Sequence, residues 1–376
     1  MKPNQYSVSE LRRANRNRVY RYLYESMEPQ TTQDVARALS MSLPTVNQNL
    51  SELLDMGLID NSKIAPSNGG RRPRVLSIIP EARYAIGAEI SHHHIRIVAV
   101  DLEVRELGYQ SVERRFSVSD DYALGLAHDI EAFIKKFSLD RDKLLGIGIT
   151  FPGIVNAEQG IVVYAPTLQL HQQSIGLLTR YIPYEVSFCN DANAGGFAEW
   201  WNQPDLTSMA YLSLGRGIGG AILINGAPYE GLHQRSGEFG HMCIHPGGKP
   251  CACGRQGCLE AYCSTAVLSH DLGITLEEFF QSLEAGDETN TQLWDRYLDD
   301  LAIGILNIHT ALDCNVVLGG QLSQYAQDQI REIVEKMNRI DASRDTSGYF
   351  QLCRYHEKSN GIGAALQFID SFLSSI

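Results

Sequence analysis

Long apolar stretches are absent from this 376-residue sequence. Because no run approaches the roughly 18 residues that cross a bilayer, we expect no membrane segment. A secretion signal is absent as well, so we expect a cytoplasmic protein whose cysteines stay reduced. The positive charge typical of proteins that coat nucleic acids is also missing, since the formal net charge is −12.

The charge is unevenly distributed along the chain. Residues 1–80 contain 11 Lys and Arg against 7 Asp and Glu, a net charge of +4, and the remaining residues carry −16. A chain of this length suggests two or three domains. We therefore expect a mildly basic DNA-binding domain at 1–80, called the head, and an acidic domain at 81–376, called the body.

The head has the periodicity of a helix-turn-helix. We predict one helix from about Ser7 to Glu25, a short one after Thr31 or Thr32, and a third with Pro44 in its first turn. The apolar residues expected on the buried face of the third helix are Leu43, Val46, Leu50, Leu53 and Leu54. The polar residues expected on its free face, where they suit base edges and phosphates, are Thr45, Asn47, Gln48, Asn49 and Glu52.

Two strands at 58–64 and 74–79 are predicted after this helix, which makes the head a winged helix-turn-helix. The wing has two glycines at its tip, followed by Arg71, Arg72 and Arg74. Arginines beside a recognition helix suit phosphates or a minor groove. A solvated loop is the alternative for so short a charge run, but the neighbouring helix-turn-helix favours DNA contact.

A cysteine-rich segment lies at 236–264. Its spacing predicts a closed Cys3His set for structural zinc, made of His241, Cys251, Cys253 and Cys258. The glycines between them allow a short backbone to fold around a metal. A disulfide pair is the alternative, which a reducing compartment disfavours. Cys243 and Cys263 are spare thiols nearby.

Glu238-x-Gly240-His241, followed by Cys-x-Cys-Gly-x-x-Gly-Cys-x-Glu from Cys251 to Glu260, resembles the signature of the ROK family, which groups sugar-responsive repressors with bacterial sugar kinases. The resemblance implies that the histidine and three cysteines bind zinc. It also implies that Glu238, His241 and Glu260 contact sugar hydroxyls, which suits carboxylates and a metal-held imidazole. The head resembles the DNA-binding part of ROK repressors, which their kinase relatives lack.

Strands alternate with helices in the body, which predicts an α/β chain of two lobes. Strands are expected at 85–90, 95–101 and 108–116, and a helix at 120–137. Further strands run into the turn at Gly153, into Asn190-Asp191, and into the glycine loop 215–220. This order resembles the actin-like ATPase (ribonuclease H-like) fold of hexokinases and ROK proteins from about Tyr84 to the C-terminus.

In the kinases that this chain resembles, the residue matching Asp191 takes the proton from the sugar hydroxyl, and the one matching Asn190 binds sugar. Such a base can hold a hydroxyl whether or not phosphate is transferred, so it predicts sugar binding better than kinase activity. Gly153 would bring backbone close to the sugar. The alternative is that Asn190 and Asp191 only cap the following helix.

The phosphate loops depart from the kinase pattern. Glu89, Ser91 and His93 stand where the resemblance implies Asp, Gly and Thr, so side chains fill the space that ATP phosphates would need. The second loop has Arg216 and the third has Gln321 in place of small residues. We therefore expect that ATP use is lost or vestigial. His92, His93 and His94 are expected to form a surface cluster rather than a second metal site.

These observations predict a sugar-responsive DNA-binding repressor of carbohydrate genes. It is expected to act as a homodimer or higher oligomer on an inverted-repeat DNA operator. The alternative is an ATP-dependent ROK sugar kinase with an accessory DNA-binding head. Glucose is in doubt as the effector, because 167–171 lacks the Asn-Leu-x-Gly-Trp element of many glucose-phosphorylating relatives. Another aldose such as xylose, an amino sugar or a disaccharide remains open.

Overall fold

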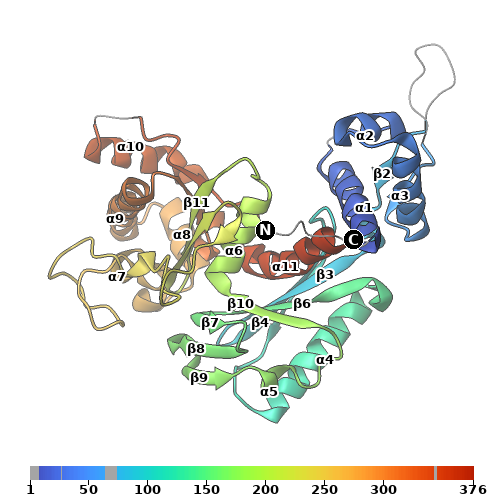
Figure 1. Ribbon diagram of the computed structural model, residues 1–376. Coiled ribbons are helices and arrows are strands. Elements are labelled where there is room, and N and C mark those ends of the chain that lie inside the picture. Colours follow the sequence, from blue (N-terminus) through green and yellow to red (C-terminus); the bar gives the residue numbers. More distant parts are fainter. Residues whose placement is uncertain (1–7, 27, 64–73, 343–344) are drawn as a thin grey trace.

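The computed structural model describes residues 8–26, 28–63, 74–342 and 345–376. Two five-stranded sheets, one in each lobe, form the body (Figure 1). In the first sheet the order is β10 (Val186–Asn190), β6 (Leu144–Phe151), β3 (Tyr84–Ile90), β4 (His94–Asp101) and β5 (Glu106–Glu113). In the second it is β15 (Phe350–Leu352), β14 (Asn315–Gly319), β11 (Ser208–Leu214), β12 (Ile218–Ile224) and β13 (Ala227–Pro228).

The two sheets repeat one pairing pattern. β3 is antiparallel to β4 and parallel to β6, and β11 is antiparallel to β12 and parallel to β14. The outer pairs repeat as well, since β4–β5 and β12–β13 are antiparallel while β6–β10 and β14–β15 are parallel. A small sheet of β7 (Ile154–Asn156), β8 (Ile161–Ala165) and β9 (Leu170–Ser174) is attached to the first lobe. The predicted two-lobed α/β fold is confirmed.

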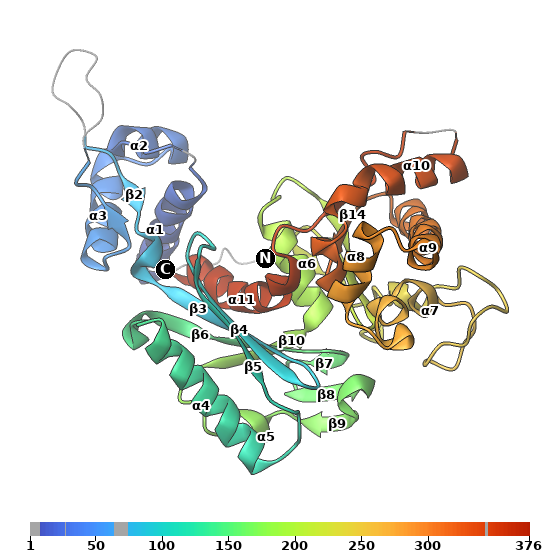
Figure 2. The ribbon, with the colours of Figure 1, turned by 180° about the vertical axis from the view of Figure 1, so that it is seen from behind.

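Helices cover the sheets and separate the lobes. α4 (Asp120–Lys136) and α5 (Gly176–Thr179) lie on the first lobe, whereas α8 (Leu276–Glu284), α9 (Glu288–Leu312) and α10 (Ile330–Ile340) lie on the second (Figure 2). The helices α6 (Asp191–Trp201) and α11 (Ser359–Ser375) pack together between the two sheets. Among the described residues, no helix combines the length and the apolarity needed to cross a membrane.

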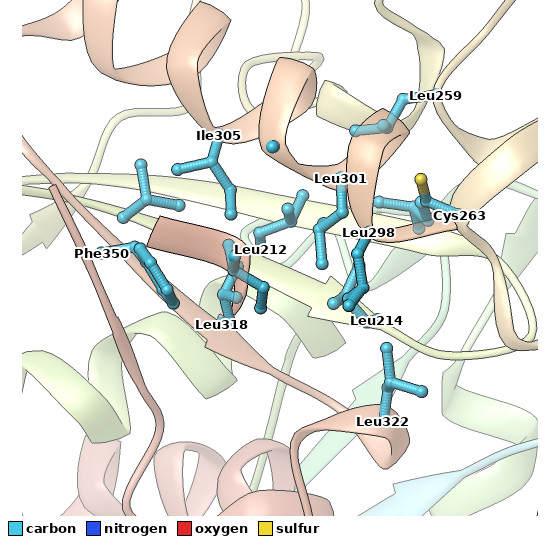
Figure 3. Close-up of a cluster of buried hydrophobic side chains, with 14 of the residues drawn as sticks. Leu212, Leu214, Leu259, Cys263, Leu298, Leu301, Ile305, Leu318, Leu322 and Phe350 are labelled. Atoms are coloured by element: carbon cyan, nitrogen blue, oxygen red, sulfur yellow. The ribbon is translucent and has the colours of Figure 1, made fainter. Parts of the chain in front are cut away.

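The core of the second lobe forms where one face of the sheet meets α9. Leu212, Leu214 and Leu318 point from β11 and β14 toward Leu298 and Leu301 of the helix, and all five are fully buried (Figure 3). Residues two apart on a strand share a face, and residues three apart on a helix lie on one side, so both elements present a continuous apolar surface. Each such leucine contributes roughly 1.5–3 kcal/mol of burial free energy.

Small residues allow α11 to lie directly on its neighbours. A Cβ atom at Gly87 would be 1.7 Å from the carbonyl oxygen of Gly361, and one at Gly363 would be 1.7 Å from that of Ala194. Neither contact leaves room for a side chain. The backbone of α11 is therefore in direct contact with the backbones of both β3 and α6.

The head contains α1 (Val8–Glu25), α2 (Thr32–Leu39) and α3 (Leu43–Asp55), followed by the antiparallel pair β1 (Ile59–Asp60) and β2 (Ser77–Ile78). The predicted three helices are confirmed. Thr31 forms a capping box with Asp34 at the start of α2, and Ser42 caps α3. The wing strands are shorter than predicted, although the Val75 N–H also donates to the Lys63 carbonyl at 3.0 Å.

Two predictions about α3 are wrong. Leu43, expected inside, is 45% exposed, and Asn49, expected on the free face, is only 2% exposed. The Asn49 side-chain N–H donates to the Thr45 carbonyl at 2.7 Å, so this donor is used within the helix. Helical spacing gives the direction of each side chain, but the depth of burial depends on how α1 and α2 pack against α3.

The head is joined to the body by a continuous apolar cluster. Val19, Tyr20 and Leu23 of α1 belong to the same buried cluster as Ile369 and Leu373 of α11. Polar contacts border this junction, since the Arg13 side chain donates to the Ser375 carbonyl at 2.9 Å and the Tyr24 hydroxyl to the Leu102 carbonyl at 2.7 Å. The division of the chain at residue 80 stays a prediction, and the head packs on the C-terminal helix of the body.

Candidate functional site

The predicted Cys3His residues come together in space. One ligand atom from each of His241, Cys251, Cys253 and Cys258 lies within 4.8 Å of all the others. The Sγ atoms of Cys253 and Cys258 are 3.7 Å apart, and Sγ of Cys251 is 3.7 Å from Nδ1 of His241. A tetrahedral zinc ion with bonds of about 2.0–2.3 Å separates its ligand atoms by about 3.3–3.8 Å. The four residues therefore fit a zinc ion.

Tight turns shape the loop that carries these cysteines. Gly257 has a φ of +78°, and a Cβ atom there would be 1.8 Å from the His245 carbonyl oxygen. A side chain at this position would therefore clash with the backbone as well as strain it. Cys243 is exposed, and the buried Cys263 donates to the Tyr297 carbonyl at 3.7 Å. Both stay outside the ligand set.

Two carboxylates border the cluster. Nε2 of His241, the nitrogen that does not face Cys251, is 3.8 Å from an oxygen of Glu238. One Glu260 oxygen lies 3.8 Å from the Cys251 sulfur, and the other accepts the Ile218 N–H at 2.9 Å. Glu260 therefore connects the cysteine-rich segment to the first residue of β12.

Asn190 and Asp191 lie where β10 ends and α6 begins. The Asn190 side chain accepts the Asn193 N–H at 2.8 Å, so it does cap the helix. Its amide donates to the Gly153 carbonyl at 2.7 Å and to Asp191 at 3.1 Å. The capping interpretation is thus correct for Asn190, and the same residue also orients Asp191.

The Asp191 carboxyl is in an unusual electrostatic environment. Burial raises the pKa of Asp191 to about 7, and the negative charges of Glu89 and Glu238 contribute. These three carboxylates come from α6, the end of β3 and the segment that precedes His241. The two lobes therefore bring acidic groups together around Asp191, and its raised pKa favours the protonated form, which can donate a hydrogen bond as well as accept one.

The backbone conformation and the surroundings at position 153 require a glycine. Its φ is +119°, and a Cβ atom would lie 2.3 Å from the Tyr164 carbonyl oxygen on β8. The close approach in the structure is therefore to β8, and the Gly153 carbonyl is held by Asn190. Its contact with a sugar stays a prediction.

Side chains in and beside the turn after β3 form hydrogen bonds with one another or with neighbouring elements. Glu89 accepts from Asn360 of α11 at 3.0 Å and from Arg96 of β4 at 3.3 Å. The Ser91 hydroxyl donates to the His94 carbonyl at 2.9 Å. His92 and His93 pack edge to face with their ring nitrogens 3.1 Å apart. The partners of Glu89 were not found from the sequence, although Arg96 lies directly opposite it in the hairpin register.

Part of the predicted second glycine loop is strand instead. Gly219 and Gly220 belong to β12, and a Cβ atom at Gly220 would be 2.5 Å from the Gly237 carbonyl oxygen. These glycines allow the segment before Glu238 to pack on the strand. The turn itself is short, and Arg216 within it is exposed. Glycine content alone does not distinguish a turn from a closely packed strand.

The structure describes only some of the residues that are predicted to contact DNA. Asn47 and Gln48 are exposed on α3, Thr45 is half-buried, and Arg74 is exposed at the base of the wing. Arg71 and Arg72 lie outside the described residues. Glu52, expected near the free face, instead pairs with Arg16 of α1 at 2.7 Å and with Arg12. These ion pairs hold α1 against α3.

Known proteins resemble this chain in sequence and in fold. Residues 85–370 match the ROK family. The xylose repressor of Caldicellulosiruptor bescii is 24% identical over 333 residues, covering 81% of this chain and 84% of the relative. The transcriptional dual regulator NagC of Escherichia coli K12 is 26% identical over 281 residues, covering 73% of this chain and 68% of NagC.

Solved structures show the same fold. A ROK family transcriptional regulator, described as a homologue of the E. coli MLC protein, superposes with a TM-score of 0.76 at 22% identity and covers 97% of this chain and 98% of its own. The ROK hexokinase of Thermus thermophilus has a TM-score of 0.60 at 26% identity and covers 75% of this chain and 97% of its own. From its sequence match and its two-lobed architecture, the chain belongs to the ROK family.

Proposed function

We propose that this chain is a sugar-responsive DNA-binding repressor of carbohydrate genes. The observation that carries the proposal is the packing of a helix-turn-helix head on the C-terminal helix of a ROK body. The regulator that superposes on 97% of the chain extends over this head, whereas the hexokinase covers 75%. The names of the xylose repressor and of NagC support the same assignment.

The effector sugar is held by a ring of hydrogen-bonding groups from both lobes. In this proposal these groups are Gly153, Asn190, Asp191, Glu238, His241 and Glu260. Carboxylates accept from sugar hydroxyls, and an Asp191 with a pKa of about 7 can also donate to one. His241 presents Nε2 on the side of Glu238.

Zinc has a structural role in the proposal. His241, Cys251, Cys253 and Cys258 would hold the ion, and the bound metal would fix the orientation of the imidazole. Because Glu260 lies against Cys251 and binds the start of β12, the same loop sets the position of this carboxylate. The metal supplies no catalytic step.

ATP use is absent from the proposed function. The Glu89 carboxylate is engaged by Arg96 and Asn360, and the turn after it carries serine and histidine side chains. Kinase activity is the second candidate, which Asp191 supports because its pKa of about 7 suits a general base. A coupled assay with ATP, magnesium and a panel of sugars decides between them, and turnover at an ordinary enzymatic rate would favour the kinase.

The helix α11 offers a route from the sugar to the DNA. Asn360 in its first turn binds Glu89, and Ser375 at its end binds Arg13 of the head. Seventeen residues of α-helix span about 25 Å. A sugar that changes the position of Glu89 or α6 would therefore shift the base on which the head packs, which is how two distant sites become coupled.

The proposed partners are a double-stranded operator and a second copy of the chain. One α3 with its exposed Asn47 and Gln48 presents a small surface, so a dimer on an inverted repeat, with half-sites an integral number of turns apart, would provide the affinity of a repressor. A cytoplasmic location belongs to this proposal.

Selection of DNA sites from a random pool, followed by titration with a sugar panel, tests the proposal. Asp191→Asn and Glu238→Ala should keep sugar-free DNA affinity and lose most of the response to sugar. A protein that selects no DNA sequence, or that responds normally in both variants, would contradict the proposed function.

A further inference from the structure

Leu43 is an apolar residue of the head whose side chain is not part of the buried core. Its spacing matches that of Val46 and Leu50 on the buried face of α3, yet it is 45% exposed. Leu39 and Met41, which precede it, pack against the buried cluster of the head, whereas Leu43 does not belong to that cluster within the described residues. Packing of the head therefore does not explain a leucine at this position.

The first turn of α3 holds Leu43 in a defined position. Ser42 is the N-cap, and its hydroxyl accepts the Thr45 N–H at 3.3 Å and shares a hydrogen bond of 2.8 Å with the Thr45 hydroxyl. This cap fixes the start of the helix, so Leu43 is its first residue. In helix-turn-helix proteins, the N-terminal residues of the recognition helix are those that contact base edges.

Leu43 also lies beside the polar side chains that are assigned to DNA. Asn47 follows it by four residues, so the two are on one side of α3 and about 6 Å apart along its axis. Asn47 and Gln48 are exposed, whereas Glu52 pairs with α1. The exposed side of α3 therefore begins with apolar groups and continues with two amides.

Apolar side chains and amides recognise different features of a base pair in the major groove. The amides of asparagine and glutamine form paired hydrogen bonds with adenine, whereas an apolar side chain suits the C5-methyl group of thymine. Cytosine has an amino group in the major groove and no methyl group, so a leucine distinguishes the two pyrimidines. Contact with thymine would remove apolar surface of both partners from water.

We propose that Leu43 contacts the methyl group of one thymine in each half-site of the operator, and that this contact selects a T·A pair there. The inference rests on the proposed function, because it requires that α3 reads DNA, and it specifies one base of the operator. Successive base pairs are about 3.4 Å apart, so this thymine should lie within about two base pairs of the base that Asn47 contacts.

Deoxyuridine tests the contact, because it pairs as thymidine does and lacks only the methyl group. Each thymidine of an operator selected from a random pool would be replaced in turn, at equivalent positions of both half-sites, and the affinity of the full-length protein measured. We expect one position at which the wild type loses about fourfold in affinity per half-site, which corresponds to the roughly 0.8 kcal/mol of one buried methyl group. Leu43→Ala should bind both operators equally at that position.

Met56→Ala is the matched control, because Met56 is 38% exposed but lies at the opposite end of α3. This variant should keep the full dependence on the methyl group. Leu43→Met retains an apolar side chain and should keep most of it. An unchanged melting temperature of Leu43→Ala would exclude misfolding of the head as the cause of its altered binding.

Two results would overturn the inference and leave the proposed function unaffected. One is a wild-type protein that binds every deoxyuridine operator as tightly as the unmodified operator. The other is an undiminished methyl dependence in Leu43→Ala, which would mean that DNA shape or another residue causes the effect. Failure of the protein to select any DNA sequence would instead overturn the proposed function together with the inference.

Discussion

The two lobes position their shares of the site by different means. In the second lobe, Glu238 and His241 lie at the two ends of a single 3-10 turn, and His241 is one of the four residues that fit a zinc ion. In the first lobe, Glu89 is the penultimate residue of β3, while Asp191 begins α6 between the lobes. We therefore expect that loss of the proposed metal would disturb the part of the site in the second lobe and spare the part that is built on regular structure.

Removal of the metal should have the largest effect. Cys253→Ser deletes one thiolate of the proposed zinc set, so we expect loss of near-stoichiometric zinc, loss of sugar binding, and a melting temperature lower by roughly 5 °C or more. Metal analysis and calorimetry measure these changes. The far-ultraviolet circular dichroism should change little, because the loop contributes few residues to the helices and strands.

Cys243→Ser provides the control for this experiment. Cys243 lies in the same segment but is exposed and outside the ligand set. Its replacement should retain zinc and sugar binding. Equal zinc loss in both variants, or a well-folded wild-type protein without metal, would refute the zinc site.

Asp191→Asn should produce the second largest effect, and its sign depends on pH. Because the folded-state pKa of Asp191 is about 7, above the ordinary value of 3.8 for an aspartate, the folded protein binds this proton more tightly than the unfolded chain does. The folded state therefore loses stability as pH rises from about 4 to 7. The asparagine variant avoids this loss and should melt a few degrees higher than wild type at pH 8, but not at pH 4.

The same variant should bind sugar roughly 10- to 100-fold more weakly at pH 8, since a charged acceptor is replaced by a neutral amide. Melting curves at the two pH values and titration with the effector measure both effects. A stability difference that is the same at pH 4 and pH 8 would show that Asp191 does not have a raised pKa.

Local patterns in the sequence predicted much of this architecture. The alternation of strands and helices, the three helices of the head and the Cys3His grouping all depend on residues close together in the chain. The pairing of Glu89 with Asn360 joins residues 271 positions apart, so no local pattern contains it. The burial of Asn49 and the strand position of Gly220 were missed for the same reason, because each depends on which element packs against it.

The smallest expected effect is on the coupling between sugar binding and DNA binding, and not on sugar affinity itself. Asn360→Ala removes the hydrogen bond between α11 and Glu89 while leaving the carboxylates that we assign to sugar. We expect sugar affinity to change by no more than a few-fold, whereas the sugar-induced change in DNA affinity should fall about fivefold, a coupling loss of about 1 kcal/mol.

Gln367→Ala is the matched control, since Gln367 also lies on α11 but binds Ser187 of β10 at 3.2 Å. Sugar titrations of operator binding for both variants give the two coupling free energies. If the first lobe transmits the signal through Asn360, only Asn360→Ala should weaken the coupling. If both variants behave alike, the coupling does not depend on this contact. The hypothesis that the second lobe binds sugar with the help of a metal while the first lobe transmits the signal would then be wrong.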